Sequence, residues 1–336
     1  MKLGLNFGYW GQGPRDGVVD EARAAERLGF DSVWVAETWG SEAFVYSTWL
    51  AAHTSTIKIG TGIAQMAART PTATAMAATT LDHLSGGRMI LGLGVSGPQV
   101  VEGWYGQPSA RPLARTREYV EIVRRALRRD EPVEFDGELY QIPFRGDGSQ
   151  GLGKPLRLMT HPRRPDLPIF LGAEGPKNVT QTAEIADGWL PLYYSPFRQE
   201  IYADQLVRAK PGFEIYAPVT FTIADDVAAA LAPVKAMLTF YVGGMGAPGK
   251  NFHTNLMARL GYAEEAYAVQ ELFLAGKRDE ALARMPDDFA DEVSLVGPPT
   301  RIRERLDAWR AGPVTALMIG ARPPDELEEI RNLVVG

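Results

Sequence analysis

The residues that could do chemistry in this sequence cluster at the ends of short apolar segments. Most of them are glycines, aromatic residues and amides. The stretch TIKIGTGIAQMAARTPTATA over residues 56–75 contains two of these glycines. Gly60 and Gly62 interrupt an apolar segment there. Glycine weakens a strand interior, so it usually marks a bulge or a close approach to the backbone. A site rich in glycine and aromatic rings but poor in titratable groups is typical of a protein whose bound cofactor carries the chemistry.

A second candidate is the stretch GAEGPKN over residues 172–178, between an apolar segment and a predicted helix. The first turn of a helix offers free N–H groups and a positive dipole end, and Lys177 adds a cation. This combination is suited to a phosphate group. Ordinary helix capping is the alternative interpretation of the Gly-Pro pair.

Other kinds of catalytic site find little support. His53, His83, His161 and His253 show no spacing of three or four residues that would indicate a metal site. His53 and His83 fall on predicted helices, where we expect structural roles, whereas His161 and His253 fall in irregular segments that could form a lid. Ser96 lies outside any GxSxG motif. The absence of cysteine excludes disulfides and thiolate nucleophiles.

Composition narrows the class of protein further. The 336 residues include 35 Lys and Arg against 41 Asp and Glu, a formal charge of −6, so there is no basic surface for nucleic acid. The first residues, MKLGLNFGYWGQG, resemble a strand rather than a signal peptide. No apolar segment approaches the roughly 18 residues that cross a bilayer. We therefore expect a cytoplasmic protein without a membrane partner.

The elements that must position these residues alternate between strand and helix. Each apolar segment is followed by a helical pattern, and the predicted strands cover residues 3–9, 31–37, 57–65, 89–95, 168–175, 189–194, 213–223 and 314–321. Parallel strands buried on both faces are expected to be continuously apolar. The sequence predicts one domain, residues 1–336, folded as a closed (β/α)8 TIM barrel. An open doubly wound sheet is the alternative.

Two segments break the alternation, residues 131–167 after the fourth strand and residues 244–296 after the seventh. The first begins with a predicted hairpin over 133–142, turning at Asp136-Gly137. Loops longer than about 12–15 residues in compact domains are usually functional or disordered. We expect both insertions to cover the active end of the barrel as a lid.

In such barrels the site lies at the carboxyl ends of the strands. This rule places Glu37 among the candidate site residues, where it could relay a proton, with a structural hydrogen bond as the alternative. It also selects Trp10, Trp39 and Tyr194 as residues that line a pocket for an apolar or planar substrate. Ordinary packing of the loops is the alternative for these aromatic residues.

These residues resemble the luciferase-like flavin and deazaflavin oxidoreductases, over most of the chain. The resemblance rests on IKIGTGIAQMAARTPTATAMAATTLDHLSGGRMILGLGVSGPQVVEGWYG (57–106), LGAEGPKNV (171–179) and AEIADGWLP (183–191). It is strongest to the actinobacterial branch that binds coenzyme F420, a 5-deazaflavin.

The resemblance implies a cofactor ring seated over the third strand, on a bulge with a cis peptide bond at Gly62–Ile63. It implies the cofactor's phosphate at the start of the helix after the fifth strand. The residues expected at the cofactor are Gly62, Ile63, Ala64, Ser96, Gly97, Gly172, Glu174, Gly175, Pro176, Lys177 and Asn178.

One departure from the family pattern concerns the end of the second strand. Some deazaflavin dehydrogenases of the family carry Asp-His there, with the histidine near the ring, whereas this chain has Glu37-Thr38. A histidine proton donor at that position is absent, which argues against dehydrogenation of sugar phosphates or simple alcohols.

Three functions follow from the resemblance. The first is an F420-dependent oxidoreductase that moves a hydride to or from a small organic substrate. The second is an FMN-dependent monooxygenase supplied by a separate reductase, and the third is a barrel that binds a flavin without catalysis. No metal is expected. We expect a homodimer formed through the apolar predicted helix over residues 42–54.

Overall fold

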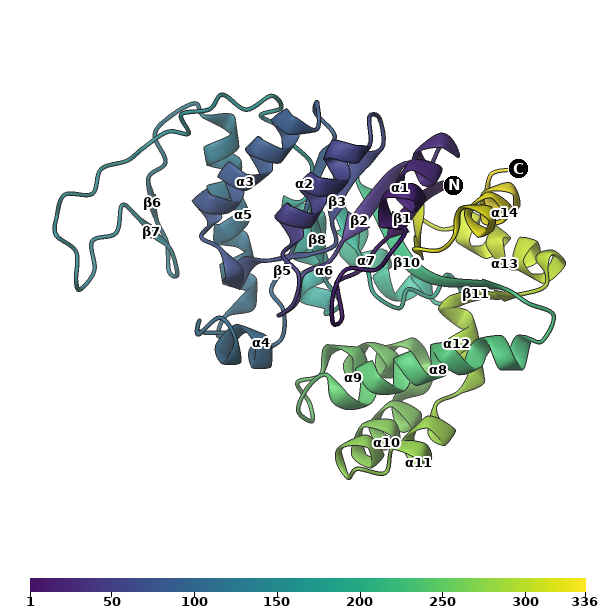
Figure 1. The fold of residues 1–336 in the computed structure, drawn as a ribbon. Helices are drawn as coiled ribbons and strands as arrows, with labels where there is room; N and C mark the ends of the chain where they lie inside the picture. Colours follow the sequence, from purple (N-terminus) through teal and green to yellow (C-terminus); the bar gives the residue numbers. More distant parts are fainter. The chain divides into compact units, whose positions relative to one another are not determined.

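Eight parallel strands pair in a closed order in the structure, a computed structural model that describes residues 1–336. They are β1 (Lys2–Asn6), β2 (Ser32–Val35), β3 (Lys58–Thr61), β5 (Met89–Gly94), β8 (Ile169–Gly172), β9 (Gly188–Leu190), β10 (Glu214–Ile223) and β12 (Ala316–Gly320). Each pairs with the next in this order, and β12 pairs with β1, which closes the ring. Figure 1 colours the elements in the order of the chain. Two short strands, β4 (Ala64–Gln65) and β11 (Ser294–Gly297), pair with β5 and β10. The predicted (β/α)8 barrel is confirmed.

Helices connect the strands as the sequence pattern predicts. They are α1 (Val18–Arg27), α2 (Ala43–His53), α3 (Pro71–Leu84), α4 (Pro98–Gly103), α5 (Pro112–Arg128), α6 (Pro176–Ile185), α7 (Ala203–Leu206), α8 (Val227–Gly244), α9 (Phe252–Met257), α10 (Ala263–Leu274), α11 (Arg278–Arg284), α12 (Asp287–Glu292), α13 (Pro299–Ala311) and α14 (Pro324–Val334). Three single turns complete them, η1 (Met66–Ala68), η2 (Gln199–Tyr202) and η3 (Ala258–Tyr262). Helix α3 begins where Thr70 Oγ1 accepts a hydrogen bond from Ala73 N at 3.2 Å, a typical amino-terminal cap.

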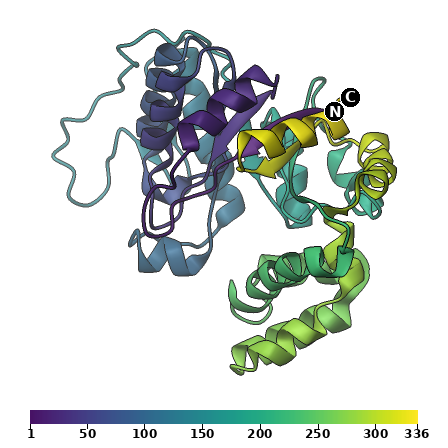
Figure 2. The ribbon, with the colours of Figure 1, turned by 45° about the vertical axis from the view of Figure 1, so that its right-hand side comes forward.

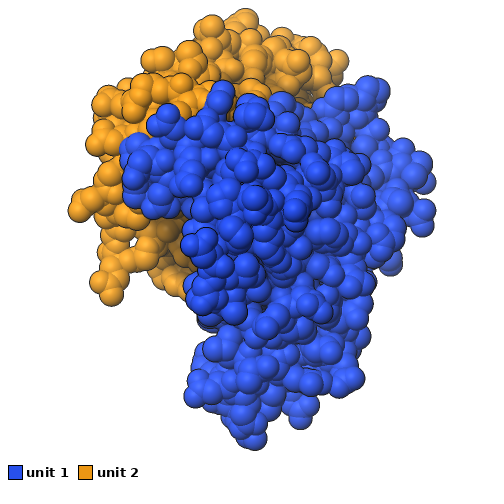
Figure 3. Space-filling view, turned by 90° about the vertical axis from the view of Figure 1, so that its right-hand side faces the viewer, with its two compact units in different colours: residues 1–6, 173–183, 189–336 blue, residues 7–172, 184–188 orange.

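The chain divides into two compact units. Unit 1 contains residues 1–6, 173–183 and 189–336, and unit 2 contains residues 7–172 and 184–188 (Figure 3). Unit 2 holds β2 to β8 with α1 to α5, and unit 1 holds β1, β10 to β12 and the helices from α7 onward. That residues 1–336 act as one domain stays a prediction.

The first insertion, residues 131–167, lies at the wrong end of the strands for a lid. It contains the predicted hairpin, β6 (Phe135–Asp136) paired with β7 (Gln141–Ile142). It leaves from the end of α5, however, and not from a strand. Arg164 pairs with Asp82 near the end of α3 and donates to the carbonyl of Met89, where β5 begins. The expectation of a lid over the carboxyl ends was therefore wrong for this segment.

The second insertion follows β10 and is longer than predicted. Helix α8 lies beside α10 (Figure 2), with the rings of Phe240 and Phe273 6.2 Å apart, so the insertion begins at α8 rather than at residue 244. It ends in β11, which pairs in parallel with β10. Arg259 in η3 donates to the carbonyl of Glu174, just beyond the carboxyl end of β8. That this insertion is a lid stays a prediction.

Helix α8 also corrects the expectation that no segment could cross a membrane. Its 18 residues have a mean hydropathy of 1.4, which meets the requirement by length and composition alone. The sequence does not show it as one long apolar segment, because its apolar character comes largely from alanines interrupted by Pro233 and Lys235. Core helices of other proteins meet the same requirement, so this single helix is weak evidence for a membrane partner.

Candidate functional site

The third strand contains the bulge that its glycines suggested. Gly60 is opposite Ile90 of β5, and Ala64 is opposite Leu93. The segment from Gly60 to Ala64 thus advances four residues while β5 advances three, so it contains one extra residue between these two pairs. This is the definition of a β-bulge, a feature over-represented next to active sites.

The bare backbone at Gly60 and Gly62 makes room for a tryptophan. A Cβ on Gly60 would lie 2.3 Å from Cε3 of Trp34, and a Cβ on Gly62 would lie 3.3 Å from the same atom. Trp34 comes from the neighbouring strand β2, is fully buried, and donates from Nε1 to Ser32 Oγ at 2.8 Å. The space beside Gly60 is therefore filled by Trp34 and not by a cofactor, whereas Gly62 is only half-buried, and its contact with a cofactor stays a prediction.

Ile63 lies in the bulge, and its environment differs from that of the two glycines. The peptide bond Gly62–Ile63 is cis, as the resemblance implied. A Cβ on Gly94 would lie 2.9 Å from Cδ1 of Ile63, and one on Gly172 would lie 3.2 Å from its Cγ2. The isoleucine side chain is therefore fitted over two bare strand ends, and because it is only half-buried it presents an apolar surface.

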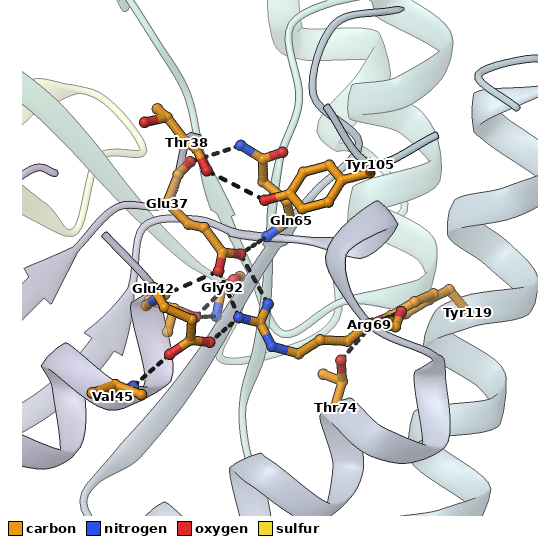
Figure 4. A network of polar contacts seen from close by, with 12 residues as sticks. Glu37, Thr38, Glu42, Val45, Gln65, Arg69, Thr74, Gly92, Tyr105 and Tyr119 are labelled. Atoms are coloured by element: carbon orange, nitrogen blue, oxygen red, sulfur yellow. Dashed lines mark hydrogen bonds and ion pairs between the residues drawn. The ribbon is translucent and has the colours of Figure 1, made fainter. Parts of the chain in front are cut away.

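Glu37, the predicted proton relay, is held by an arginine (Figure 4). Its side chain is 5% exposed, and the Arg69 guanidinium donates to the two carboxylate oxygens, from Nη1 at 2.9 Å and from Nη2 at 2.6 Å. Gln65 N donates to the same carboxylate at 2.7 Å. A carboxylate so fully bonded has no free position for a substrate proton, so the structure favours the structural alternative.

Arg69 also reaches Glu42, whose carboxylate accepts from Val45 N at 2.6 Å and caps helix α2. The arginine thereby joins the end of β2 to the start of α2. Sequence reasoning missed Arg69, because it lies 32 residues from Glu37 and no spacing pattern connects the two.

The backbone beyond Glu37 is fixed from the other side (Figure 4). Gln65 Nε2 donates to the carbonyl of Glu37 at 2.9 Å, and the Tyr105 hydroxyl donates to the carbonyl of Thr38 at 3.2 Å. Burial raises the pKa of Tyr105, so the phenol keeps its proton and stays a donor.

Ser96 follows β5 in a conformation that is uncommon for any residue except glycine. Its φ is 61°, and it leads directly into Gly97, the residue that caps α4. Residues other than glycine whose backbone adopts this left-handed conformation cluster at active sites and ligand clamps. The expected contact of Ser96 and Gly97 with a cofactor stays a prediction.

The predicted aromatic pocket is only partly supported. Trp39 is 56% exposed, and Trp10 is half-buried with its ring 5.2 Å from that of Tyr46. Tyr194, in contrast, is 1% exposed and stacks on Tyr202 at 5.5 Å. Tyr194 belongs to the core, so its assignment to a substrate pocket was wrong; a strand-end aromatic can point inward as readily as outward.

The start of helix α6, in unit 1, offers fewer N–H groups than expected. Asn178 N and Val179 N both donate to the carbonyl of Gly175 at 2.9 Å, and Pro176 has no N–H. The backbone donors left for an anion are those of Gly175 and Lys177. A Cβ on Gly175 would meet no atom within 4 Å, so there is room beside this backbone.

Glu174 precedes this helix and contacts the second insertion within unit 1. Its Oε2 lies 3.0 Å from Nδ1 of His253 in α9, and its carbonyl accepts from Arg259. Sequence reasoning placed His253 only in an irregular segment, because nothing in the sequence relates residues 174 and 253.

Comparison with known proteins gives a consistent picture. A family model described as luciferase-like monooxygenase matches residues 6–316. The chain is 48% identical, over 99% of both chains, to a Mycobacterium tuberculosis protein named "Putative coenzyme F420-dependent oxidoreductase Rv3520c". It is 29% identical to a 5,10-methylenetetrahydromethanopterin reductase of Archaeoglobus fulgidus, over 92% of this chain and 91% of that one.

Solved structures show the same fold. The coenzyme F420-dependent tetrahydromethanopterin reductase of Methanopyrus kandleri superposes with a TM-score of 0.79 at 23% identity, over 99% of this chain and 98% of that one. An F420-dependent secondary alcohol dehydrogenase, solved with an F420-acetone adduct, superposes with a TM-score of 0.72 at 19% identity, over 99% of each chain.

Proposed function

Because the chain belongs to the luciferase-like monooxygenase family, we propose that it is an oxidoreductase that uses coenzyme F420. The observation that carries the proposal is the 48% identity, over 99% of the chain, to the mycobacterial protein named for this cofactor. Bound F420 would supply or accept a hydride at C5 of its deazaflavin ring. The protein's task is then to seat the ring, hold the cofactor's charged end and place a small organic substrate.

The surface formed by Ile63 supports a planar ring. The side chain rests on Gly94 and Gly172 and stays half exposed, so its open side is apolar and held in place by the strands beneath it. A planar aromatic ring gains most from a rigid apolar support of this kind. We propose that the central ring of the cofactor lies against Ile63, with Ala64, Ser96 and Gly97 nearby.

The start of α6 supports the binding of a negatively charged group. The N–H groups of Gly175 and Lys177 have no partner within the chain, and they stand at the positive end of a helix of 10 residues. We propose that these two donors and the Lys177 side chain bind the cofactor's phosphate.

The test is a direct comparison of cofactors. Purified protein is titrated with F420 and, separately, with FMN, and binding is followed by cofactor fluorescence. We expect F420 to bind more tightly than FMN. Exclusive binding of FMN would favour an FMN-dependent monooxygenase, the second candidate, to which the family's description points. Failure to bind either cofactor would refute both.

A substrate search should follow with the F420-loaded protein. Hydride transfer at C5 interrupts the conjugation of the deazaflavin ring, so turnover can be monitored by the change in its absorbance with any candidate substrate. Comparing the metabolites of a deletion strain with those of its parent would supply the candidates. Tight F420 binding with no turnover of any compound would favour a non-catalytic barrel.

We also propose a homodimer formed through α2 and the adjoining α3. Val45 and Trp49 on α2 are 72% and 42% exposed, and Met76 on α3 is 58% exposed. Exposed apolar residues gathered on neighbouring helices are typical of a protein interface.

A further inference from the structure

Residues 143–159 form an arm that projects from its own unit. The arm follows strand β7 and stands away from the helices of that unit in both ribbon views (Figures 1 and 2). None of its residues is buried. The hydrogen bonds at its tip are local, such as those that Ser149 donates to the carbonyls of Gly146 and Phe144. Because the arm buries no side chain, packing within one chain does not offset the entropy lost on ordering it.

The arm carries large apolar side chains that face solvent. Leu152 is 82% exposed and Met159 is 94% exposed, and Phe144 and Leu156 are exposed as well. Single exposed apolar residues are normal on a protein surface, whereas an exposed apolar surface that continues over several residues marks an interaction site. The arm is therefore built to contact another molecule.

The root of the arm lies beside the proposed α2–α3 interface. Arg129 Nε donates to the carbonyl of Leu158 at 2.8 Å, and His83 Nε2 lies 2.8 Å from the carbonyl oxygen of His161. His83 is in the last turn of α3, and the next residue, Leu84, is 66% exposed. The exposed apolar residues of α3 and those of the arm thus adjoin each other at this end of the helix.

The composition of this region favours a second copy of the chain as the partner. Helix α2 contains no Lys, Arg, Asp or Glu, and α3 contains only Asp82. Depletion of charged residues is typical of the core of a protein–protein interface. A surface that binds an anionic membrane would instead carry a larger cluster of Lys and Arg.

The charge of the arm also suits a second copy. The arm holds three basic residues and one acid, so it contributes +2 to the formal charge of −6, and the remainder of the chain carries −8. Lys154 and Arg157 form no ion pair within the chain. A basic arm is attracted to another acidic copy, and such complementarity favours the correct encounter.

We propose that the arm of each chain lies against its partner at the edge of the α2–α3 interface, an inference that rests on the proposed homodimer. The contact is reciprocal under two-fold symmetry, so both arms are covered at once. The arm would thereby extend the dimer interface beyond the two helices.

The first test uses the absence of cysteine from the chain. The variant Leu152→Cys places one thiol on the arm, and its alkylation by N-ethylmaleimide is followed below and above the dimer dissociation constant measured by light scattering. Where about nine chains in ten are dimeric, we expect alkylation about tenfold slower than in dilute protein, the limit set by occupancy. Val207→Cys is the matched control, because Val207 is 79% exposed in the other unit, and its thiol should react at one rate throughout.

The second test removes the apolar side chains from the arm. Leu152→Ser/Met159→Ser should raise the dimer dissociation constant about tenfold or more, because two apolar side chains no longer enter the interface. The circular dichroism spectrum should not change, since neither residue is buried in one chain. Val207→Ser, the control, should leave the dissociation constant unchanged.

The outcomes separate the proposals. A dimer whose arm thiol reacts at one rate at every concentration would overturn the inference and leave the proposed dimer intact. A wild-type protein that is monomeric throughout would refute both. Protection of the thiol by phosphatidylglycerol vesicles, but not by a rise in protein concentration, would overturn the inference in favour of a membrane contact. The F420 titration is independent of all these results.

Discussion

The substitution Gly60→Ala should destabilise the protein even before any cofactor binds. The new methyl carbon would lie 2.3 Å from Cε3 of Trp34, and carbon atoms normally approach no closer than about 3.5 Å. Trp34 is fully buried and tied to Ser32, so the indole cannot move into solvent. Forcing one extra carbon into a packed core typically costs about 1–3 kcal/mol.

Two other substitutions calibrate this effect. Gly62→Ala places its methyl carbon 3.3 Å from the same indole atom, so a smaller loss is expected. Gly320→Ala at the end of β12 meets no atom within 4 Å and has no positive φ, so it is the matched control. Where the backbone is compatible and there is room, Gly→Ala stabilises by about 0.4–1 kcal/mol through the unfolded chain. We therefore expect opposite signs at residues 60 and 320.

The assay is urea unfolding followed by circular dichroism, with the midpoint compared at constant slope. Combining Gly60→Ala with Trp34→Phe, which removes part of the indole that the new methyl carbon would meet, should recover part of the loss, and a double-mutant cycle would measure the coupling. A Gly60→Ala protein as stable as the wild type, but with weakened cofactor binding, would refute this reasoning and restore the cofactor interpretation.

The other predictions concern charge, ligand binding and assembly. Arg69→Met would leave the buried Glu37 carboxylate without its cation, so we expect the free energy of unfolding, measured in urea, to fall by about 3–5 kcal/mol. A fall of less than about 1 kcal/mol would contradict this prediction. Gly175→Val should weaken cofactor binding in fluorescence titrations without lowering the melting temperature, since a Cβ at this position meets no atom within 4 Å; unchanged affinity would count against the phosphate site. Burial acts to raise the pKa of Glu26, but backbone N–H groups of the segment before β3 outweigh it and lower that pKa to about 2. Because the folded-state pKa lies below the ordinary glutamate value of 4.5, the stabilisation is present above pH 4.5 and is lost as pH falls toward 2. The melting temperature of Glu26→Gln should therefore depend less on pH in that range than that of the wild-type protein. Trp49→Glu should shift the light-scattering mass from dimer to monomer, whereas a wild-type protein that is already monomeric at micromolar concentration would disprove the interface.

The barrel could be predicted from the sequence alone because the signals for its strands and helices lie within short segments of the chain. Apolar segments such as residues 89–95 are continuous enough to indicate buried strands, and the helix after Thr70 carries its own start signal. The bulge on the third strand was likewise predicted from glycines within that strand. These features need only the order of residues along the chain.

The details of the site depend on which residues face one another across strands, and the sequence does not contain that register. Gly60 and Trp34 are paired directly across β3 and β2, which is why the glycines serve the tryptophan. Arg69 and Glu37, like His253 and Glu174, come together only after distant elements pack. The sequence also could not predict that the Tyr194 side chain points into the core, because side chains beyond the end of a strand no longer alternate between its two faces.

The seat formed by Ile63 has a consequence for anyone who wishes to redesign the enzyme. Its side chain fills the space left by missing Cβ atoms at Gly94 and Gly172, so three strands share one volume. A larger residue at either glycine would push the Ile63 side chain toward whatever lies on its exposed side. The space above Ile63 would then become shallower, while its width would not change. Libraries that vary position 94 or 172 should therefore vary position 63 at the same time, with valine or alanine there as the compensating choice.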